Sequence, residues 1–210
     1  MNTKEVILLE ALKQFSQRGY EAVSMRDIAK QIGITQGALY KHYASKQDIF
    51  DSIIEKMEMN DSERARMHNV PEGIYADMEE AYQNTQMEQL NEFAEAQFRY
   101  WTEDEFASNF RKMITIEQYT NPIKTALYQQ YLSSGIIGYV EELLQEVSVK
   151  EGWEQDNLKH LALEYFAPIY MLMNLYDGTD NKDEPIKLVR EHLARFNRAI
   201  NYKKEKERKG

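Results

Sequence analysis

The stretch SMRDIAKQIGITQGALYKHYASKQDIF, residues 24–50, decides how this chain folds. Ser24 and Asp27 have the spacing of a capping box, in which the serine oxygen accepts from an amide of the first helical turn and the acid bonds the amide of the cap. Apolar residues then follow at helical spacing, and Gly33 fits the left-handed position that comes after a helix. The pattern predicts a helix of two turns that begins at about Met25.

A third helix is predicted almost directly after this one, over residues 36–43. Only Ile34 and Thr35 stand between the glycine and this helix, and Thr35 is its natural N-cap. Two short helices joined by so tight a turn are typical of a helix-turn-helix. Ser45 and Asp48 then repeat the capping-box spacing, which predicts a longer fourth helix from about residue 46.

The sequence on both sides of this stretch is also helical. Leu8, Leu12 and Phe15 recur at helical spacing and Gly19 follows them, so a first helix is predicted over the first fifteen or so residues. Glycine and proline are sparse, with nine and four in 210 residues, and residues that favour helix are plentiful. We therefore predict an all-α fold. Later helix breaks are predicted near residues 69–71, 102–103, 121–122, 152 and 177–178.

Charge divides unevenly along the chain. The formal net charge is −9, yet residues 1–50 carry seven basic and five acidic side chains, which leaves −11 for residues 51–210. The first segment is mildly basic and the rest strongly acidic, a distribution that could keep DNA off all but the first segment, or could serve solubility alone.

The composition also limits the compartment. There is no cysteine, so disulfides and thiolate sites are excluded. Charged residues interrupt the apolar N-terminal stretch, and the apolar stretch at 165–176 is shorter than the roughly 20 residues that span a bilayer. We expect a cytoplasmic protein without a membrane segment.

No pattern for covalent chemistry or cofactor binding is found. The sequence has no G-x-S-x-G elbow, P-loop or G-x-G-x-x-G, and its four histidines are scattered. The acidic stretch 177–184 contains Lys182 and lacks the spacing of an EF-hand, so a solvated turn is the better interpretation. We predict no catalytic residue, no metal site and no cofactor.

A helix-turn-helix binds DNA because its second helix fits the major groove, where base edges present distinguishable patterns. Gln36 opens that helix, where its carboxamide can bond adenine, and Gly37 leaves room for the backbone to approach the bases. Each polar residue taken alone is more often an ordinary surface residue or a helix cap. Phosphates can be met by Ser24, Thr35, Tyr40, Lys41 and Lys46, and His42 shares the outward face of the helix.

Taken as a whole, residues 24–50 resemble the signature of the tetracycline-repressor (TetR) family. The shared features are a Thr or Ser before the second helix, Ile-Ala, a small-Gly-aliphatic turn, Leu-Tyr-x-His-aromatic, and Ser-Lys with an acid and an apolar residue. Phe15 with Gly19-Tyr20 extends the resemblance to about residues 4–57. Gly37 departs from the archetype, which has a bulkier residue there, so the operator sequence is not predicted.

The resemblance implies a homodimer whose two heads bind a palindromic double-stranded operator, with a small-molecule effector in each body. It implies repression as the usual outcome, while activation stays open. The domains it implies are a helix-turn-helix head at 1–60 and an effector-binding and dimerisation body at 61–210. By this resemblance Arg26 and Gln36 contact bases. The residues that hold the DNA backbone would be Ser24, Thr35, Tyr40, Lys41, His42 and Lys46.

The dimer interface is predicted on the last two helices, over 158–176 and 185–202, packed with their mates as a four-helix bundle. Further apolar residues widen the first of these helices' apolar surface beyond one core face, among them Leu163, Phe166 and Tyr170. The residues predicted at the interface are Leu161, Tyr165, Ile169, Met173, Leu188, Leu193 and Phe196.

Aromatic and methionine side chains are frequent between residues 90 and 175, which suits an apolar effector cavity but equally an ordinary core. Two alternatives to the ligand-responsive regulator stay open. One is a helical enzyme or carrier that includes a helix-turn-helix-like hairpin, and salt-dependent binding to palindromic DNA would separate it. The other is a regulator governed by a partner protein or by abundance, and a ligand bound to the purified protein would argue against it.

Overall fold

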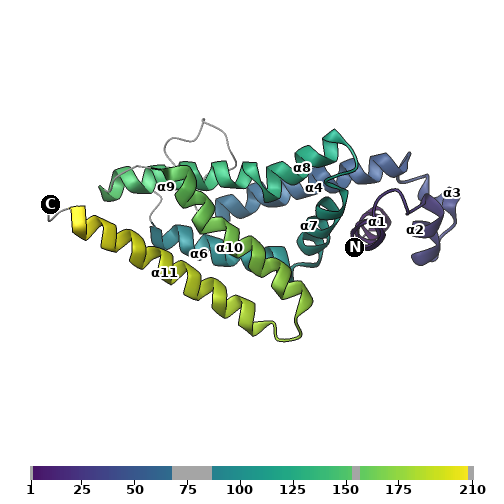
Figure 1. The fold of residues 1–210 in the computed structure, drawn as a ribbon. Helices are drawn as coiled ribbons and strands as arrows, with labels where there is room; N and C mark the ends of the chain where they lie inside the picture. Colours follow the sequence, from purple (N-terminus) through teal and green to yellow (C-terminus); the bar gives the residue numbers. More distant parts are fainter. Residues whose placement is uncertain (1, 68–86, 153–156, 208–210) are drawn as a thin grey trace. The chain divides into compact units, whose positions relative to one another are not determined.

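The computed structural model describes residues 2–67, 87–152 and 157–207, with side chains up to residue 201. Every regular element among these residues is an α-helix, which confirms the all-α prediction (Figure 1). In chain order the helices are α1 (Thr3–Arg18), α2 (Met25–Gln31), α3 (Gln36–Leu39), α4 (Lys46–Met67), α6 (Met87–Glu103), α7 (Glu105–Glu117), α8 (Pro122–Leu132), α9 (Ser134–Glu151), α10 (Leu158–Gly178) and α11 (Asp183–Glu207).

The chain forms two compact units. Unit 1 comprises residues 1–61 and 104–129, and unit 2 comprises residues 62–103 and 130–210. The first boundary falls beside the predicted division at residue 60, but no sequence pattern indicated that α7 and most of α8 pack with the first four helices. The assignment of effector binding and dimerisation to 61–210 stays a prediction.

The core of unit 1 forms where α1 packs along α7. Phe15 on α1 and Phe110 on α7 are fully buried, as are Ile28 of α2, Leu39 of α3 and Ile53 of α4. Each of these helices contributes at least one apolar side chain to a common core. This core anchors the two short helices α2 and α3. That anchoring leaves the polar sides of the two short helices outside.

In unit 2, α10 packs against α6, α9 and α11. The core-facing side of α9 is aliphatic, with Leu143, Leu144 and Val147 fully buried. The hydroxyl of Tyr165 on α10 donates to the main-chain carbonyl of Leu90 at 3.1 Å, which satisfies its one polar atom inside this core. Packing in unit 2 is thus mainly apolar.

The helix ends follow most of the predicted breaks. Helices end or begin at 103–105, at Pro122, at Gly152 and at Gly178, while the break predicted near 69–71 lies outside the described residues. A break at Ser133, between α8 and α9, was not predicted. A Cβ at Gly135 would lie 2.3 Å from the carbonyl oxygen of Gln130, so this junction requires a glycine that no turn motif announces.

Most of the residues predicted at the dimer interface are already covered within the single chain. Six of the seven are buried inside the single chain and therefore belong to the core of unit 2. The seventh, Leu188, is partly exposed. A stripe at helical spacing shows that a face is buried, but not whether the chain itself or a partner covers it. The six core residues are Leu161, Tyr165, Ile169, Met173, Leu193 and Phe196.

The apolar side chains that widen the surface of α10 lie outside this core. Leu163 and Leu175 are each 44% exposed and Met171 is 67% exposed, while Phe166 and Tyr170 are half-buried. Helix α10 thus carries apolar side chains on its outward face as well as in the core. None of the described helices is long and apolar enough to cross a membrane.

Candidate nucleic-acid interface

Helix α2 begins with the predicted capping box. The Ser24 hydroxyl oxygen accepts from the Asp27 amide at 3.2 Å, and the Asp27 carboxylate accepts from the Ser24 amide at 2.9 Å and from the Ser24 hydroxyl at 2.6 Å. These bonds from the Ser24 hydroxyl and amide hold the pKa of Asp27 below its ordinary value. The start of α2 is therefore fixed locally, by two side chains three residues apart.

The turn between α2 and α3 also follows the sequence pattern. Gly33 has a φ of +74°, in the left-handed region, and the amide of Ile34 donates to the carbonyl of Ala29 at 3.0 Å. Thr35 caps α3, because its hydroxyl accepts from the Ala38 amide at 3.1 Å. The helix-turn-helix hairpin is thus specified by capping residues at each of its corners.

Helix α3 is shorter than predicted. It ends at Leu39, and residues 40–42 continue as a tighter turn in which the amide of His42 donates to the carbonyl of Leu39 at 2.9 Å. Tyr43 then turns inward, where its hydroxyl donates to the carbonyl of Lys4 at 3.2 Å. Burial, with nearby Asp48 and Glu5, raises the pKa of Tyr43 to about 12. This tyrosine is a structural anchor and not part of the outer surface.

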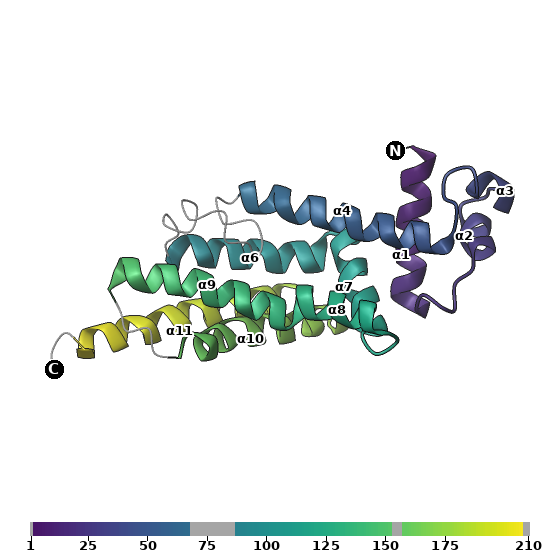
Figure 2. The same ribbon diagram turned by 90° about the horizontal axis from the view of Figure 1, so that it is seen from above.

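Most residues predicted to meet DNA lie on the outside of the hairpin. The basic side chains among them, Arg26 and Lys41, are joined there by the exposed Lys30 of α2. Figure 2 shows α2 and α3 side by side. The hairpin exposes hydroxyl, carboxamide and cationic groups, which is the chemistry that phosphates and base edges bind. The eight exposed residues are Ser24, Arg26, Thr35, Gln36, Gly37, Tyr40, Lys41 and His42.

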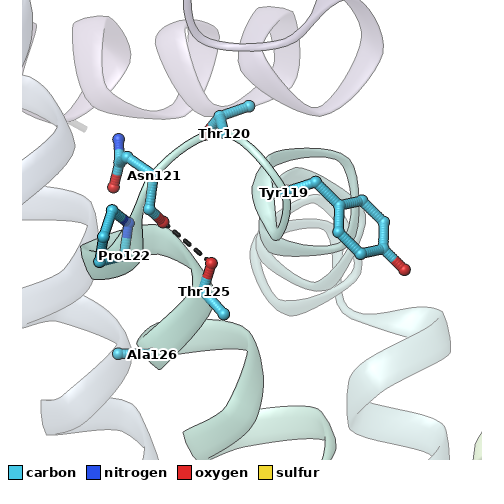
Figure 3. A pocket seen from close by; sticks show the side chains of 6 residues that line it. All are labelled: Tyr119, Thr120, Asn121, Pro122, Thr125 and Ala126. Atoms are coloured by element: carbon cyan, nitrogen blue, oxygen red, sulfur yellow. Dashed lines mark hydrogen bonds between the residues drawn. The ribbon is translucent and has the colours of Figure 1, made fainter.

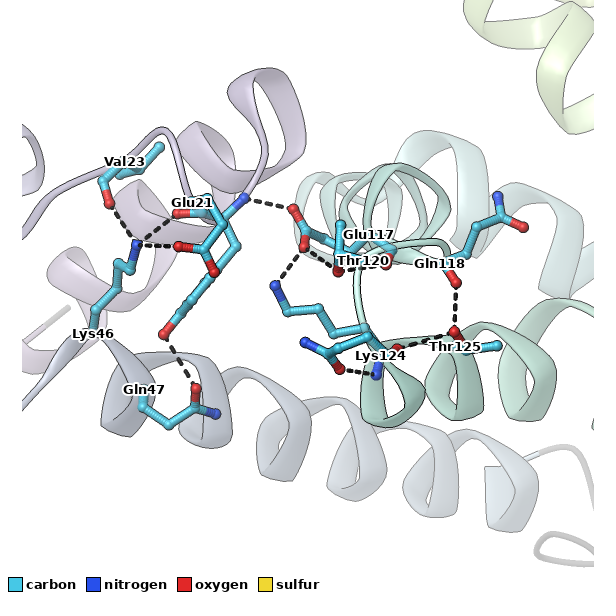
Figure 4. Close-up of polar contacts among 11 residues, drawn as sticks. Glu21, Val23, Lys46, Gln47, Glu117, Gln118, Thr120, Lys124 and Thr125 are labelled. Carbon is cyan, nitrogen blue, oxygen red and sulfur yellow. Dashed lines mark hydrogen bonds and ion pairs between the residues drawn. The ribbon is translucent and has the colours of Figure 1, made fainter.

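Lys46 differs from the other predicted contacts. Its ammonium donates to the carbonyls of Tyr20 at 2.8 Å and Val23 at 3.0 Å, and Figure 4 shows it pointing toward Val23 and Glu21. The side chain is 21% exposed, so its donors are largely used within the protein. These carbonyls lie 26 and 23 residues away in the chain, so sequence spacing could not predict that Lys46 bonds the α1–α2 loop. We assign Lys46 to the structure of the α1–α2 loop.

Helix α4 begins with a variant of the predicted second capping box. The hydroxyl oxygen of Ser45 accepts from the Asp48 amide at 3.0 Å, as the spacing requires. The Asp48 carboxylate, however, accepts from the amide of Ala44 at 2.7 Å, one residue before the cap. The spacing identified the helix start, although the second bond goes to a different amide.

Tyr20, in the loop between α1 and α2, is the centre of contacts that the sequence did not reveal. Its amide donates to Glu117 at 2.7 Å, and its hydroxyl donates to Gln47 at 3.2 Å. The ammonium groups of Lys46 and Lys124 each lie 4.1 Å from the centre of its ring, at cation–π distance. Burial and neighbouring acids, Glu21 foremost, raise the pKa of the Tyr20 hydroxyl.

Glu117 and Lys124 form a buried ion pair beside this tyrosine (Figure 4). Their side chains are 4% and 6% exposed. Burial alone would raise the pKa of Glu117, but hydrogen bonds from Lys124 and the Tyr20 amide, the positive charge of Lys124 and the Thr120 hydroxyl together lower it. The carboxylate is therefore charged and fully engaged. Glu117 ends α7 and Lys124 lies in the first turn of α8.

A shallow pocket lies on the outside of the same turn. Figure 3 shows Tyr119 pointing away from Asn121 and Pro122, and the Thr125 hydroxyl bonded to the carbonyl of Asn121 at 3.0 Å. None of the lining residues is charged, so this pocket adds nothing to an anion-binding surface. They are Tyr119, Thr120, Asn121, Pro122, Thr125 and Ala126.

Two pockets in unit 2 are lined by described residues. One includes Asn91 of α6 with Asn197 and Asn201 of α11, and the other includes Arg99 and Arg190. Both linings are rich in polar or charged side chains and differ from the apolar effector cavity predicted within residues 90–175. That cavity stays a prediction.

The helix-turn-helix segment of unit 1 is similar in sequence to known bacterial regulators. Residues 7–53 match the family model described as "Bacterial regulatory proteins, tetR family". The chain is 45% identical over 58 residues to the HTH-type transcriptional regulator AcrR of Shigella flexneri, and the match covers 28% of this chain and 27% of that protein. The chain thus matches about a quarter of the length of this relative.

Solved structures extend the likeness to the whole fold. The fatty acid degradation regulator FadR from Bacillus halodurans superposes with a TM-score of 0.64 at 18% identity, over 93% of this chain and 95% of that one. A putative transcriptional regulator from Saccharomonospora viridis in complex with choline gives 0.63 at 20% identity, over 92% and 94%. At such identities the likeness concerns the fold alone.

The capped hairpin with its polar outer surface is a helix-turn-helix, and the other described elements of the chain are α-helices. The N-terminal segment, residues 7–53, matches the tetR family of bacterial regulatory proteins.

Proposed function

We propose that this protein is a transcription regulator that binds a palindromic operator in double-stranded DNA as a homodimer and performs no covalent chemistry. The observation that carries the proposal is the exposure of eight predicted contact residues on a hairpin whose opposite side is locked into a core. Gln36 is placed to bond a base edge and Lys41 to bind a phosphate. Where the operator overlaps a promoter, the bound dimer acts as a repressor.

The homodimer is proposed to form through the outward face of α10 together with α11. The apolar side chains left outside the core of unit 2, Leu163, Met171 and Leu175, support this choice, because a contiguous apolar face of this kind is seldom left uncovered on a monomer. A two-fold axis would also present two recognition helices to successive major grooves, as a palindromic site requires.

A small-molecule effector is proposed to bind within unit 2 and to shift the spacing of the two recognition helices. The aromatic and methionine content of residues 90–175 supports an apolar site. One protein of the same fold holds choline, which supports the capacity of the fold to bind a small molecule. The net negative charge of residues 51–210 favours neutral or cationic effectors over anions.

Selection from a library of random duplexes tests the proposal. The native protein should enrich a palindromic sequence, and fluorescence anisotropy should show binding to it at least about 10³-fold tighter than to random DNA. Affinity should fall steeply as salt rises, because phosphate contacts release counterions. Enrichment of no sequence, together with salt-independent or absent binding, would contradict the proposed function.

A further inference from the structure

The turn that joins α7 to α8 is built into the same unit as the helix-turn-helix. We call residues 117–124 the α7–α8 corner. Glu117 accepts the Tyr20 amide, 97 residues away in sequence, and Lys124 lies over the Tyr20 ring while it bonds Glu117. Thr120 adds a hydrogen bond to the same carboxylate at 3.1 Å. The corner therefore holds one defined residue of the α1–α2 loop.

That loop leads directly into the N-cap of α2. Lys46 fixes the Val23 carbonyl, and Ser24 follows as the capping residue. At the other end of the loop, Gly19 has a φ of +79°, and a Cβ there would lie 3.2 Å from a carboxylate oxygen of Glu117. Glycine thus permits both the backbone conformation and the close approach of the glutamate. The loop is thus held by Glu117 at the Tyr20 amide and by Lys46 at the Tyr20 and Val23 carbonyls.

We infer that Glu117 and Lys124 are positioning residues for DNA binding, which set the place of the α1–α2 loop and so of the Ser24 end of α2. The inference rests on the proposed function, because it concerns how the hairpin meets DNA. Both side chains are buried, so neither can touch the nucleic acid itself. Their effect must pass through Tyr20. A shift of α8 that separates Lys124 from Glu117 would displace this end of α2 and with it Arg26, a predicted base contact, so specific binding would fall while binding to random DNA is kept.

The double variant Glu117→Gln/Lys124→Met tests this inference. It removes both charges together, so no buried charge is left unpaired, and the glutamine oxygen can still accept a hydrogen bond. The matched control is Glu5→Gln/Lys56→Met, which removes an ion pair of 2.9 Å between α1 and α4 in the same unit, where the side chains are 39% and 33% exposed. The DNA is the duplex that the native protein selects from a random library.

We expect the double variant to bind the selected duplex at least tenfold more weakly than the native protein, while its affinity for random duplex and its salt dependence stay unchanged. A merely structural role would lower the melting temperature without changing the ratio of specific to random binding in the folded protein. The control variant should keep the native ratio. Binding of the double variant within twofold of the native protein would overturn the inference and leave the proposed function intact.

Failure of the native protein to select any duplex would contradict the proposed function itself, and it is seen before any variant is made. If the double variant does not melt cooperatively, Thr120→Val tests the inferred positioning role instead. It removes the hydroxyl that bonds the Glu117 carboxylate at 3.1 Å and the Glu117 main-chain carbonyl at 2.8 Å, at an exposed residue. A fall of twofold or more in specific binding would support the inference, and unchanged specific binding would overturn it.

Discussion

Two buried tyrosines, Tyr20 in unit 1 and Tyr165 in unit 2, are held in different ways. The Tyr20 ring lies close to the ammonium groups of Lys46 and Lys124, and its amide meets a carboxylate. The Tyr165 ring packs edge-on against Phe196 at 5.0 Å, and its hydroxyl meets neutral oxygens of α6. Burial raises the pKa of both hydroxyls. Charged groups from distant segments thus hold Tyr20 in unit 1, whereas apolar packing and neutral oxygens hold Tyr165 in unit 2.

The largest effect that would separate the two units is expected from Glu117→Ala. It leaves the Lys124 ammonium and the Tyr20 amide buried without their acceptor, and should lower the free energy of unfolding by about 3–5 kcal/mol. The comparison is Glu95→Ala in unit 2, which removes a less buried pair: Glu95 is 26% exposed and meets Arg190 at 2.7 Å and Arg99 at 3.4 Å. Its loss should cost about 1 kcal/mol or less. Chemical denaturation measures both, and equal losses would contradict the contrast.

The two faces of α10 provide the second test. Ile169→Ala opens a cavity in the core of unit 2 and should cost about 2–5 kcal/mol of stability. Met171→Glu, two residues on, places a charge on the outward face and should convert dimer to monomer while the chain stays folded. Sedimentation velocity at micromolar concentration distinguishes these outcomes. A Met171→Glu protein that remains dimeric would rule out this face as the interface.

Two lysines near the hairpin should behave differently. Lys46→Ala removes two charge-assisted bonds to the α1–α2 loop, at a cost of about 1.5–3 kcal/mol of stability. Lys41→Ala, on the exposed surface, should leave the melting temperature unchanged and reduce the slope of log affinity against log salt by about one. Thermal melts and a salt series of DNA-binding isotherms check the pair. The reverse assignment would return Lys46 to the DNA-contact set.

Gly37→Ala is expected to have the smallest effect, with opposite signs on folding and binding. Nothing lies within 4 Å of a Cβ built there, so alanine fits and should stabilise α3 by up to about 1 kcal/mol. The added methyl group would face the DNA and should weaken operator binding. Melting and anisotropy measurements on one sample test both signs, and tighter binding would show that Gly37 does not face the bases.

Sequence reasoning succeeded where a structure is fixed by residues close in the chain. The Ser24–Asp27 capping box, the Thr35 cap and the left-handed Gly33 are all contacts within four residues, and all were predicted. The third helix was predicted over residues 36–43, which is too long. Helix α3 ends at Leu39, and Tyr40 and the next two residues form a tighter turn.

The contacts that sequence reasoning missed are distant in the chain. Glu117 meets Tyr20 across 97 residues, and no spacing rule connects them. The side chains of α10 were assigned to a dimer because periodicity identifies a buried face without naming what buries it. Which apolar residues face the chain's own core could therefore be learned only from the packing of α10 against α6, α9 and α11.

We propose that α3 reads base edges through Gln36. The most direct measurement compares native protein and Gln36→Ala on the selected duplex and on duplexes changed at one base pair in each half-site. The claim predicts that Gln36→Ala loses about 1–3 kcal/mol of discrimination at one symmetric position and keeps it at the others, with the melting temperature unchanged. Equal discrimination at every position in the two proteins would contradict it.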